Sequence, residues 1–326
     1  MRALVYSAGG GIGDSLVSSV VAQALKQRYA TVDAITLPGH RETLLRVPEY
    51  DAVLVDDGGD GRAIAEALDD RRYDACVVTW ATARIAGIVQ RAGIPVRVGQ
   101  ARRLYSNKFT DPVTVRSETG DVTGHWSDIQ LDYARAIGCD APNAAPHFVP
   151  TDDDRAEAAA VQPSDGFLIL HPTNAEATKR GLWPTQAWSA LARALHERFA
   201  LPVLITGAPA DVPIADAIAA GSGAASIAGR LGIGAFGALA ERATAFVGIT
   251  TGTMHIAAAV GCPTTGIFPF QSDFPERWAP AGPRTAIVRA NYPCHKGDTK
   301  ENCPDYACIA NLDVPRIVAA TALLFG

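Results

Sequence analysis

The stretch RALVYSAGGGIGDSLVSSVVAQALKQRY, residues 2–29, decides the fold class of this chain. A short apolar run at residues 3–7 ends in three glycines, and residues 15–29 then carry apolar side chains at helical spacing. A buried strand that turns through glycines into an amphipathic helix is typical of an α/β domain with a parallel sheet. We therefore expect the first strand of such a sheet at residues 3–7.

The same alternation of strand and helix continues along the whole chain. In the first half it predicts strands at 32–36, 52–55 and 75–79, and helices at 42–47, 62–68, 83–91 and 126–137. In the second half it predicts strands at 167–170, 203–206, 226–227, 245–248 and 264–268, helices starting near Pro184, Asp211, Ala235 and Gly252, and a terminal helix at 314–325. Residues 142–166 are rich in Pro, Asp and Ala and predict a linker between the two series.

Two such series predict two facing, Rossmann-like, doubly wound domains. We place them at residues 1–155 and 165–326, and expect the terminal helix, 312–326, to pack back on the first domain. The length of 326 residues suits two domains of roughly 150 residues each. Ligands of such sheets bind beyond the carboxyl ends of the strands, so the cleft between the domains is the expected site.

Composition excludes several other classes of protein. The chain is 48% hydrophobic and 19% charged, which argues against disorder, and its net charge of -5 argues against broad nucleic-acid binding. Six cysteines are too few for a disulfide scaffold in a chain of this length. The first residues predict a strand and not a signal peptide, and no apolar run reaches the roughly 20 residues that a membrane-spanning helix needs. We therefore expect a cytoplasmic protein.

The glycine turn after the first strand is the first candidate site. Gly11 and Gly13 allow the backbone to approach a ligand closely, but Asp14 stands where a dinucleotide-binding turn requires a later glycine. A carboxylate there would also repel a pyrophosphate. Two interpretations of Asp14 remain open, a helix N-cap and a general base that faces the cleft.

The turn at residues 250–255 is the second candidate site. It follows a predicted strand and begins a helix of small residues. Backbone N–H groups and the helix dipole favour an anion at such a helix start, and threonine hydroxyls add donors for phosphate oxygens. The candidate residues are Thr250, Thr251, Gly252, Thr253, Met254 and His255. The alternative is threonine capping of an ordinary helix, with His255 facing either the site or the core.

Two further strand ends in the second half could also contact a ligand. The loop that follows the strand at 167–170 contains Thr173, Lys179 and Arg180, and either cation could balance the charge of a diphosphate leaving group. Gly207 and Asp211 lie at the next strand-to-helix turn and could border a nucleoside. The alternatives are a solvated loop with exposed cations and a simple helix start.

Two groups of residues raise the question of a metal. Cys294, His295, Cys303 and Cys308 could complete a tetrahedral zinc site, but no pair has the short spacing of a zinc knuckle, and ordinary thiols are the default. The acidic run at residues 152–154 could hold a cation, but a solvated helix start in a linker is the simpler interpretation. We therefore predict no metal site.

Several of these motifs together resemble glycosyltransferase family 9, the heptosyltransferases of lipopolysaccharide assembly. The resemblance rests on Gly-Ile-Gly-Asp at 11–14, Trp183-Pro184, residues 252–263 (GTMHIAAAVGCP), Trp278-Ala279-Pro280 and the late cysteines. It spans most of the chain, from Asp14 to the terminal helix. Its most specific part is the Gly-x-Met-His-x-Ala-Ala-Ala stretch.

The resemblance implies a GT-B fold, with an acceptor-binding N-terminal domain and a nucleotide-sugar-binding C-terminal domain. It implies an inverting transfer without metal or other cofactor, from a donor that is ADP-heptose by default to a glycan or lipid-linked, lipopolysaccharide-type acceptor. Association with the cytoplasmic face of the membrane would then be peripheral at most. The aspartate matching Asp14 is the family's expected general base. A lysine matching Lys179, with Arg180 as the alternative, is expected to contact the donor phosphates.

One position departs from the family pattern. The family usually has Asp where this chain has Thr250, and that aspartate is thought to hold hydroxyls of the donor sugar. Thr250 cannot supply a charged acceptor, so a different nucleotide sugar is one expectation. An inactive relative that binds a nucleotide sugar or glycan, and a nucleotide-sugar epimerase, are the alternatives, although the epimerase would need further acid and base residues. Acceptor contacts are expected from loops such as 101–111.

Overall fold

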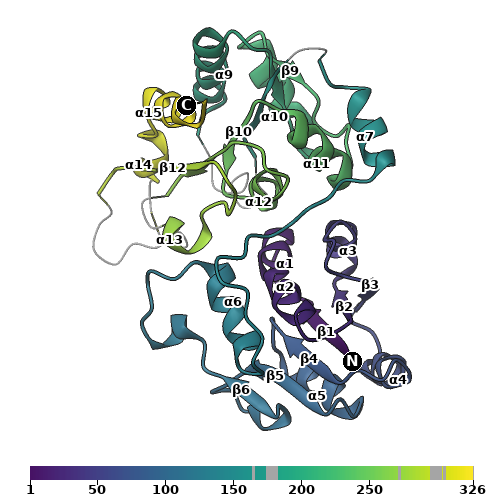
Figure 1. The fold of residues 1–326 in the computed structure, drawn as a ribbon. Helices are drawn as coiled ribbons and strands as arrows, with labels where there is room; N and C mark the ends of the chain where they lie inside the picture. Colours follow the sequence, from purple (N-terminus) through teal and green to yellow (C-terminus); the bar gives the residue numbers. More distant parts are fainter. Residues whose placement is uncertain (164–165, 174–182, 271–272, 294–302, 304–305, 326) are drawn as a thin grey trace. The chain divides into compact units, whose positions relative to one another are not determined.

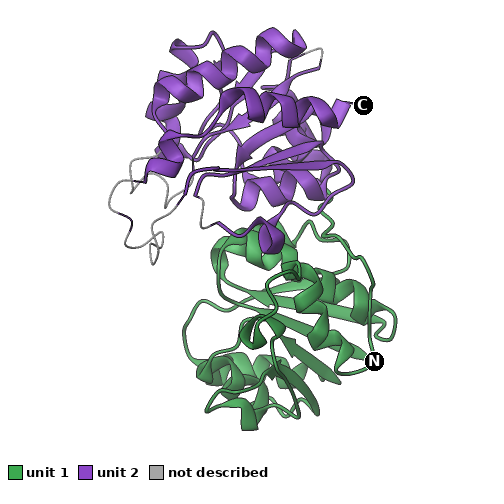
Figure 2. Cartoon of the chain, turned by 90° about the vertical axis from the view of Figure 1, so that its left-hand side faces the viewer, with its two compact units in different colours: residues 1–149 green, residues 150–326 purple. Residues whose placement is uncertain are grey.

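The computed structural model describes residues 1–163, 166–173, 183–270, 273–293, 303 and 306–325. The chain forms two compact units, residues 1–149 and 150–326, which are coloured separately in Figure 2. Each unit is built on its own parallel sheet with helices on both faces, as Figure 1 shows. The α/β, doubly wound fold class is therefore confirmed.

The first unit contains a six-stranded parallel sheet in the order β3-β2-β1-β4-β5-β6. Its strands are β1 (Arg2–Ser7), β2 (Thr31–Thr36), β3 (Ala52–Val55), β4 (Ala75–Val78), β5 (Val96–Gln100) and β6 (Asp111–Val113). Its helices are α1 (Ile12–Ser18), α2 (Val20–Lys26), α3 (Arg41–Leu44), α4 (Gly61–Asp70), α5 (Ala83–Arg91) and α6 (Trp126–Arg135), with short 3₁₀ turns at Pro38–His40, Ser106–Lys108 and Arg116–Thr119.

Successive side chains of β1 point to opposite faces of the sheet, and this explains why the unit has three layers. Ala3 and Val5 pack with side chains of α2 and α6 on one face of the sheet. Leu4 and Tyr6 pack with side chains of α4 and α5 on the other face. All four side chains are buried, because a central parallel strand is covered on both faces.

The second unit contains a six-stranded parallel sheet in the order β12-β11-β10-β7-β8-β9. Its strands are β7 (Leu168–His171), β8 (Val203–Ile205), β9 (Ala225–Ser226), β10 (Ala245–Ile249), β11 (Thr264–Phe268) and β12 (Thr285–Arg289). Its helices are α7 (Asp152–Ala159), α9 (Thr185–Phe199), α10 (Val212–Ala220), α11 (Ile233–Arg242), α12 (Gly252–Ala259), α13 (Pro275–Trp278), α14 (Ala307–Ala310) and α15 (Val314–Ala322), with 3₁₀ turns at Pro209–Asp211 and Leu323–Phe325. The terminal helix α15 packs in this unit, where Ile317 joins the core formed with β7, β10 and α9.

Both sheets have the same strand order. Numbered within its own unit, each runs 3-2-1-4-5-6, which is the Rossmann order. The order reverses between β1 and β4 in the first unit and between β7 and β10 in the second. Ligands of open parallel sheets bind at the carboxyl ends of strands at this point. The topology therefore marks one expected ligand position in each unit.

Two sequence predictions about helices need correction. The single helix expected at residues 15–29 is divided at Ser19, whose hydroxyl donates to the Leu16 carbonyl at 2.7 Å. Such back-bonding by serine bends helices. The linker expected at 142–166 is wrong over its centre, because α7 lies there and Arg155 pairs with Glu241 of α11. The acidic run at residues 152–154 does begin a helix, as expected.

Asp154 shows why this acidic run is structural. Its carboxylate accepts the Thr151 backbone N–H at 2.8 Å, and the Thr151 hydroxyl accepts the Asp154 N–H at 3.2 Å. This reciprocal pair is a capping box, which satisfies two backbone donors at the start of α7. Asp154 is buried, whereas Asp152 and Asp153 are exposed.

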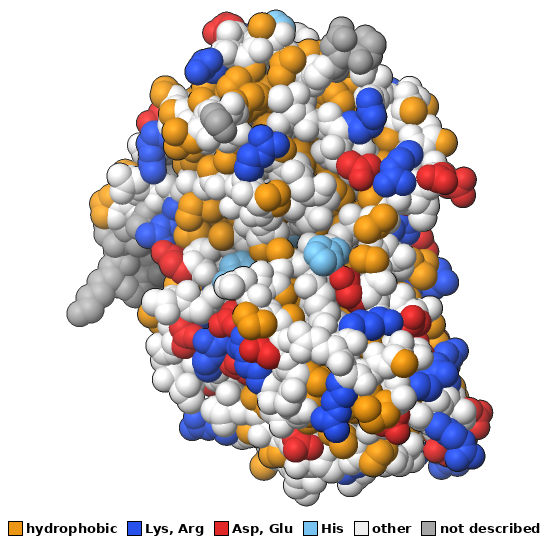
Figure 3. All heavy atoms as spheres, in the orientation of Figure 1, with side chains coloured by type: hydrophobic (Ala, Val, Ile, Leu, Met, Phe, Trp, Pro, Cys, Tyr) orange, Lys and Arg blue, Asp and Glu red, His pale blue; other side chains and the backbone are white. Residues whose placement is uncertain are grey.

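Acidic and basic side chains are mixed on the surface. Figure 3 shows acidic and basic side chains interspersed on the visible face, without one continuous basic patch. On α6, Arg135 forms ion pairs with Asp128, Asp132 and Asp140.

In the part of the chain that the structure describes, every helix is too short or too polar to cross a bilayer.

Candidate active site

The carboxyl end of β1 carries the glycine turn that the sequence singled out. Gly10 has a φ of +67°, which favours glycine, and a Cβ placed on Gly9 would lie 2.0 Å from the Trp80 ring. Trp80 follows β4, the neighbour of β1 across the point where the strand order reverses. The glycines therefore let the turn bend and let an indole ring lie directly against it.

Asp14 lies at the third position of α1, not at its N-cap, which is Gly11. Its carboxylate accepts the Gly11 backbone N–H at 2.7 Å. The N-cap interpretation is thus wrong in position, although the carboxylate does satisfy a backbone donor at the helix start. Burial raises the pKa of Asp14 above its ordinary value, and the Gly11 N–H and nearby His40 oppose that rise. A half-buried carboxylate with a raised pKa is a stronger proton acceptor than an exposed one.

His40 is a neighbour of Asp14 that sequence reasoning missed. It ends the 3₁₀ turn after β2, is buried, and its Nδ1 lies 2.8 Å from the Ser15 hydroxyl. Burial lowers the pKa of His40, and the charge of Asp14 acts in the opposite direction. Nothing in the local sequence links residue 40 to residues 14 and 15, since their proximity depends on β1 and β2 being adjacent in the sheet.

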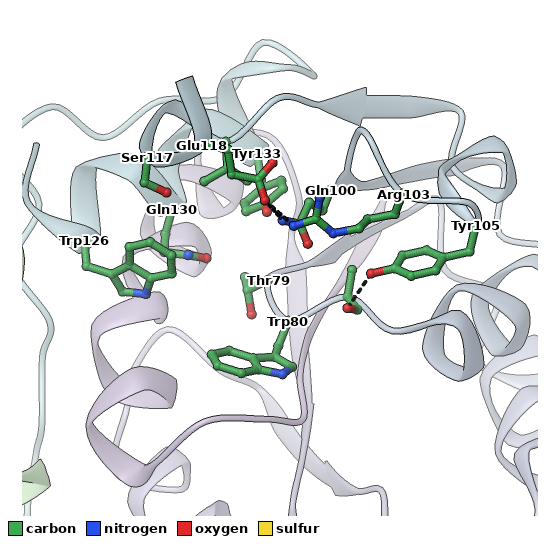
Figure 4. A pocket seen from close by; sticks show the side chains of 12 residues that line it. Thr79, Trp80, Gln100, Arg103, Tyr105, Ser117, Glu118, Trp126, Gln130 and Tyr133 are labelled. Carbon is green, nitrogen blue, oxygen red and sulfur yellow. Dashed lines mark hydrogen bonds and ion pairs between the residues drawn. The ribbon is translucent and has the colours of Figure 1, made fainter. Parts of the chain in front are cut away.

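A pocket of about 330 Å³ lies at the carboxyl ends of β4 and β5 in the first unit. Its aromatic lining comes from Trp80, Tyr105, Trp126 and Tyr133. Figure 4 shows the labelled side chains directed toward a common space, with Thr79 and Gln130 among them. Arg103 and Tyr105 belong to the segment 101–111, from which acceptor contacts were expected.

Helix α6 supplies one wall of this pocket because of its residue spacing. Trp126, Gln130 and Tyr133 are four and three residues apart, so they share one face of the helix. The ion pairs of Arg116 with Asp128 and Asp132 link α6 to the 3₁₀ turn at Arg116–Thr119. Arg135 pairs with the same two aspartates within α6. The sequence predicted this helix but not the pocket, and a glutamine between two aromatic residues on one face was the available signal.

In the second unit, α12 starts directly beyond the end of β10. Thr251 occupies the N-cap position, but its side chain makes no capping hydrogen bond. Its hydroxyl instead lies 2.6 Å from the hydroxyl of Thr253. The alternative of simple threonine capping is therefore wrong. The first turn of α12 presents backbone N–H groups without a side-chain acceptor, which is the arrangement that binds anions.

The next two residues of α12 point into the unit. Met254 is fully buried, and a Cβ placed on Gly266 of β11 would lie 2.7 Å from its sulfur atom. His255 is also buried. Of the expected donor residues, Met254 can thus reach a ligand only through its backbone, and Thr250, Thr251, Gly252 and Thr253 form the accessible part of the turn.

The end of β7 lies beside the end of β10, since His171 pairs in register with Gly248. The His171 Nδ1 lies 2.9 Å from the Thr206 hydroxyl. Burial lowers the pKa of His171 to about 4, with the charge of Asp211 opposing the shift. Thr173 is buried, and its hydroxyl has no hydrogen-bond partner among the described residues. A neutral imidazole and an unpaired hydroxyl therefore stand at the point where the strand order reverses.

Gly207 and Asp211 form the turn after β8. The Asp211 carboxylate accepts the Ala208 backbone N–H at 2.8 Å, and a Cβ on Gly207 would lie 2.8 Å from the Asp211 Cβ. Asp211 thus stabilises a helix start, which was the alternative to nucleoside binding at this turn. Any contact with a ligand would come from its second carboxylate oxygen.

Some expected residues cannot be placed. Lys179, Arg180, Cys294 and His295 lie outside the described residues. Cys308 is buried, and the Cys303 sulfur accepts the Tyr306 backbone N–H at 3.3 Å. Within the described ranges, no group of three or more His, Cys, Asp or Glu residues is arranged to hold a metal ion.

Comparison with known proteins identifies relatives along most of the chain. Residues 61–306 match the family described as glycosyltransferase family 9 (heptosyltransferase). Lipopolysaccharide heptosyltransferase 3 of Escherichia coli K12 is 24% identical over 287 residues, which cover 78% of this chain and 79% of that protein. The structure of E. coli ADP-heptose lipopolysaccharide heptosyltransferase II is similar with a TM-score of 0.80 at 20% identity, covering 99% of this chain and 98% of that one. The structure of E. coli heptosyltransferase WaaC with ADP has a TM-score of 0.71 at 18% identity, covering 89% and 94%.

Proposed function

Because the chain belongs to glycosyltransferase family 9, we propose that it moves a sugar from a nucleotide-diphosphate donor to a hydroxyl of a glycan or lipopolysaccharide-type acceptor, with inversion at the anomeric carbon. The observation that carries this proposal is the chemistry at the two places where the strand order reverses. The first unit presents a half-buried carboxylate there, and the second presents an uncapped helix start. An inverting transfer requires a group that accepts the proton of the attacking hydroxyl and a site that binds the leaving diphosphate.

The donor would bind to the second unit. Its diphosphate would accept hydrogen bonds from the backbone N–H groups and hydroxyls of Thr251 and Thr253 at the start of α12. The hydroxyl of Thr173, which has no partner in the described part of the chain, would supply a further donor. Lys179 would add a positive charge for the leaving group. Fixed dipoles at the site of developing charge stabilise the transition state without reorganising.

The acceptor would bind to the first unit, where Asp14 would take the proton of the attacking hydroxyl. Removing that proton as the oxygen bonds to the anomeric carbon raises the nucleophilicity of a weak nucleophile. The nucleoside diphosphate then leaves from the opposite face of the sugar, and the anomeric configuration is inverted. The raised pKa of Asp14 assists this step.

An ADP-linked sugar is the donor that we propose to try first. The similar fold of a heptosyltransferase whose structure contains ADP supports that choice. The family resemblance supports heptose as the sugar and a cytoplasmic reaction, with at most peripheral contact with a membrane that carries the acceptor. Thr250, in place of the family's usual Asp, supports testing other donor sugars as well.

Transfer is expected to survive exhaustive EDTA treatment. The leaving diphosphate would already be stabilised by the α12 start and Lys179, so no divalent cation is needed for charge neutralisation. The experiment incubates EDTA-treated protein with ADP-heptose and lipopolysaccharide core oligosaccharides, and follows ADP release and the anomeric configuration of the product by NMR. Loss of activity that Mg²⁺ restores would overturn metal independence, and a retained configuration would overturn the inverting mechanism.

A catalytically inactive relative is the second candidate, and Thr250 is the feature that favours it. A binding protein would show nucleotide-sugar affinity without ADP release in the presence of any acceptor tested. The retained carboxylate of Asp14 favours the enzyme. The same ADP-release assay therefore separates the two.

A further inference from the structure

Gln130 is a buried polar residue that neither unit's proposed chemistry uses. Its side chain lines the pocket of the first unit but is only 1% exposed. Its Oε1 atom has no hydrogen-bond partner among the described residues. Burying an unpaired amide oxygen destabilises a fold, so such a group in a pocket wall indicates a ligand with hydrogen-bond donors.

The aromatic residues around Gln130 indicate the shape of that ligand. Trp80 is 41% exposed, and one side of its ring lies against Gly9. Trp126 comes from α6 and lies across the same space (Figure 4). Exposed indole rings offer flat apolar surfaces. The C–H face of a pyranose is flat and apolar too, while the hydroxyls on its rim could donate to the Oε1 atom of Gln130.

The charged residues in the lining favour a ligand without net charge. Arg103 is the cation of this lining and Glu118 is its anion, and the two form an ion pair with each other. Gln100 also donates to the same Glu118 oxygen at 2.6 Å. The charge of Arg103 is thus already compensated within the protein. A phosphorylated or carboxylated sugar would have to break this pair to find a cation.

We infer that this pocket binds one uncharged sugar ring of the acceptor, packed on Trp80 and Trp126 and hydrogen-bonded to Gln130. The inference rests on the proposed function and specifies its acceptor. The volume of about 330 Å³ is at the lower end of the range for small-ligand sites, roughly 300–1,000 Å³, and suits one ring better than a lipid chain. Because Trp80 also lies against the Gly9 turn, a sugar on its exposed face is held beside the turn that carries Asp14.

The test measures binding of small glycosides to the full chain. The probes are uncharged methyl glycosides of several hexoses, with methyl glucuronide and glucose 6-phosphate as matched anions. Binding is measured by saturation-transfer NMR and by tryptophan fluorescence. We expect at least one uncharged glycoside to bind about tenfold or more tightly than both anions, a factor that corresponds to 1.4 kcal/mol. Trp80→Ala and Gln130→Leu are each expected to weaken that binding about tenfold or more.

Two controls separate this inference from a structural role and from the proposed function. Leu104→Ala changes a fully exposed residue of the neighbouring loop that does not line the pocket, and should leave glycoside binding unchanged. Gln130→Leu removes a buried amide oxygen that has no partner among the described residues, so its melting temperature should not fall. ADP affinity, which reports on the second unit, should be unchanged in every variant.

Three results would overturn the inference. They are a failure of all uncharged glycosides to bind, tighter binding of the anions, and binding that is unaffected by both Trp80→Ala and Gln130→Leu. A lower melting temperature with unchanged binding in Gln130→Leu would make Gln130 a structural residue. If no nucleoside diphosphate binds the wild-type chain, the proposed function fails, whatever the glycosides do.

Discussion

Asp14→Asn is expected to lower the single-turnover rate of sugar transfer roughly 10²- to 10⁴-fold, the usual contribution of a positioned general base. The substitution removes the proton acceptor and little else. The Asn Oδ1 atom can still accept the Gly11 N–H that Asp14 accepts at 2.7 Å. Melting temperature and donor affinity should therefore stay close to wild type. Rapid-quench measurement with saturating donor isolates the chemical step.

Asp14→Ala and the pH profile complete this experiment. Alanine cannot accept the Gly11 N–H, so it should lower the free energy of unfolding by about 1 kcal/mol in addition to abolishing the base. Burial raises the pKa of Asp14, so activity should fall as pH drops, with a midpoint above the ordinary value of about 3.9. An Asn variant with near-normal turnover would leave Asp14 as a structural residue. If His40→Gln lowered the rate as much as we expect for Asp14→Asn, His40 would be the general base instead.

Thr251→Asp is expected to raise the Kd for ADP roughly 30-fold, which corresponds to about 2 kcal/mol of repulsion between charges a few ångströms apart. The reason is that the new carboxylate would occupy the helix start where the diphosphate is proposed to bind. Aspartate is itself a good N-cap, so the empty protein should melt at the same temperature or higher. Binding and stability then move in opposite directions, which a merely misfolded variant cannot reproduce.

Thr251→Asn is the matched control for this charge. Asparagine has the shape and capping ability of aspartate without its charge. Isothermal titration with ADP should show a clearly smaller loss of affinity for Asn than for Asp. If the wild type and Thr251→Asp bound ADP with equal affinity, the start of α12 would not be part of the donor site.

The fold could be predicted from the sequence where an apolar run or a helical pattern is bounded by clear turn residues. The observed bounds of β3, α5 and β11 and the start of α12 agree with the predicted ones. The sequence changes clearly from apolar residues to turn residues at these points. Strands β5, β6 and β12 were missed. Their sequences, VRVGQ, DPV and TAIVR, contain arginine, proline or aspartate, which short strands at or near the edge of a sheet tolerate. Tertiary pairing, not local pattern, makes them strands.

The candidate site could be predicted only where it follows a strand directly. Asp14 follows β1 through a short glycine turn and Thr251 follows β10 almost directly, so a parallel sheet places both at its carboxyl edge. His40 and Gln130 reach their sites through contacts between segments distant in sequence, and no local spacing shows that. Met254 lies in the same motif as Thr251, but its side chain is fully buried, and the motif alone did not show which of its side chains are accessible.

The most direct test of the central claim is a thermal-shift titration of the wild-type chain with nucleotide sugars, including ADP-heptose, ADP-glucose, UDP-glucose and GDP-mannose. A ligand that binds only the folded state adds about 2.7 kcal/mol of stability at 100 times its Kd. We expect at least one of these donors to raise the melting temperature in proportion to the logarithm of its concentration, and we expect Thr251→Asp to abolish most of the shift. A melting temperature that no nucleotide sugar changes at millimolar concentration would contradict the central claim.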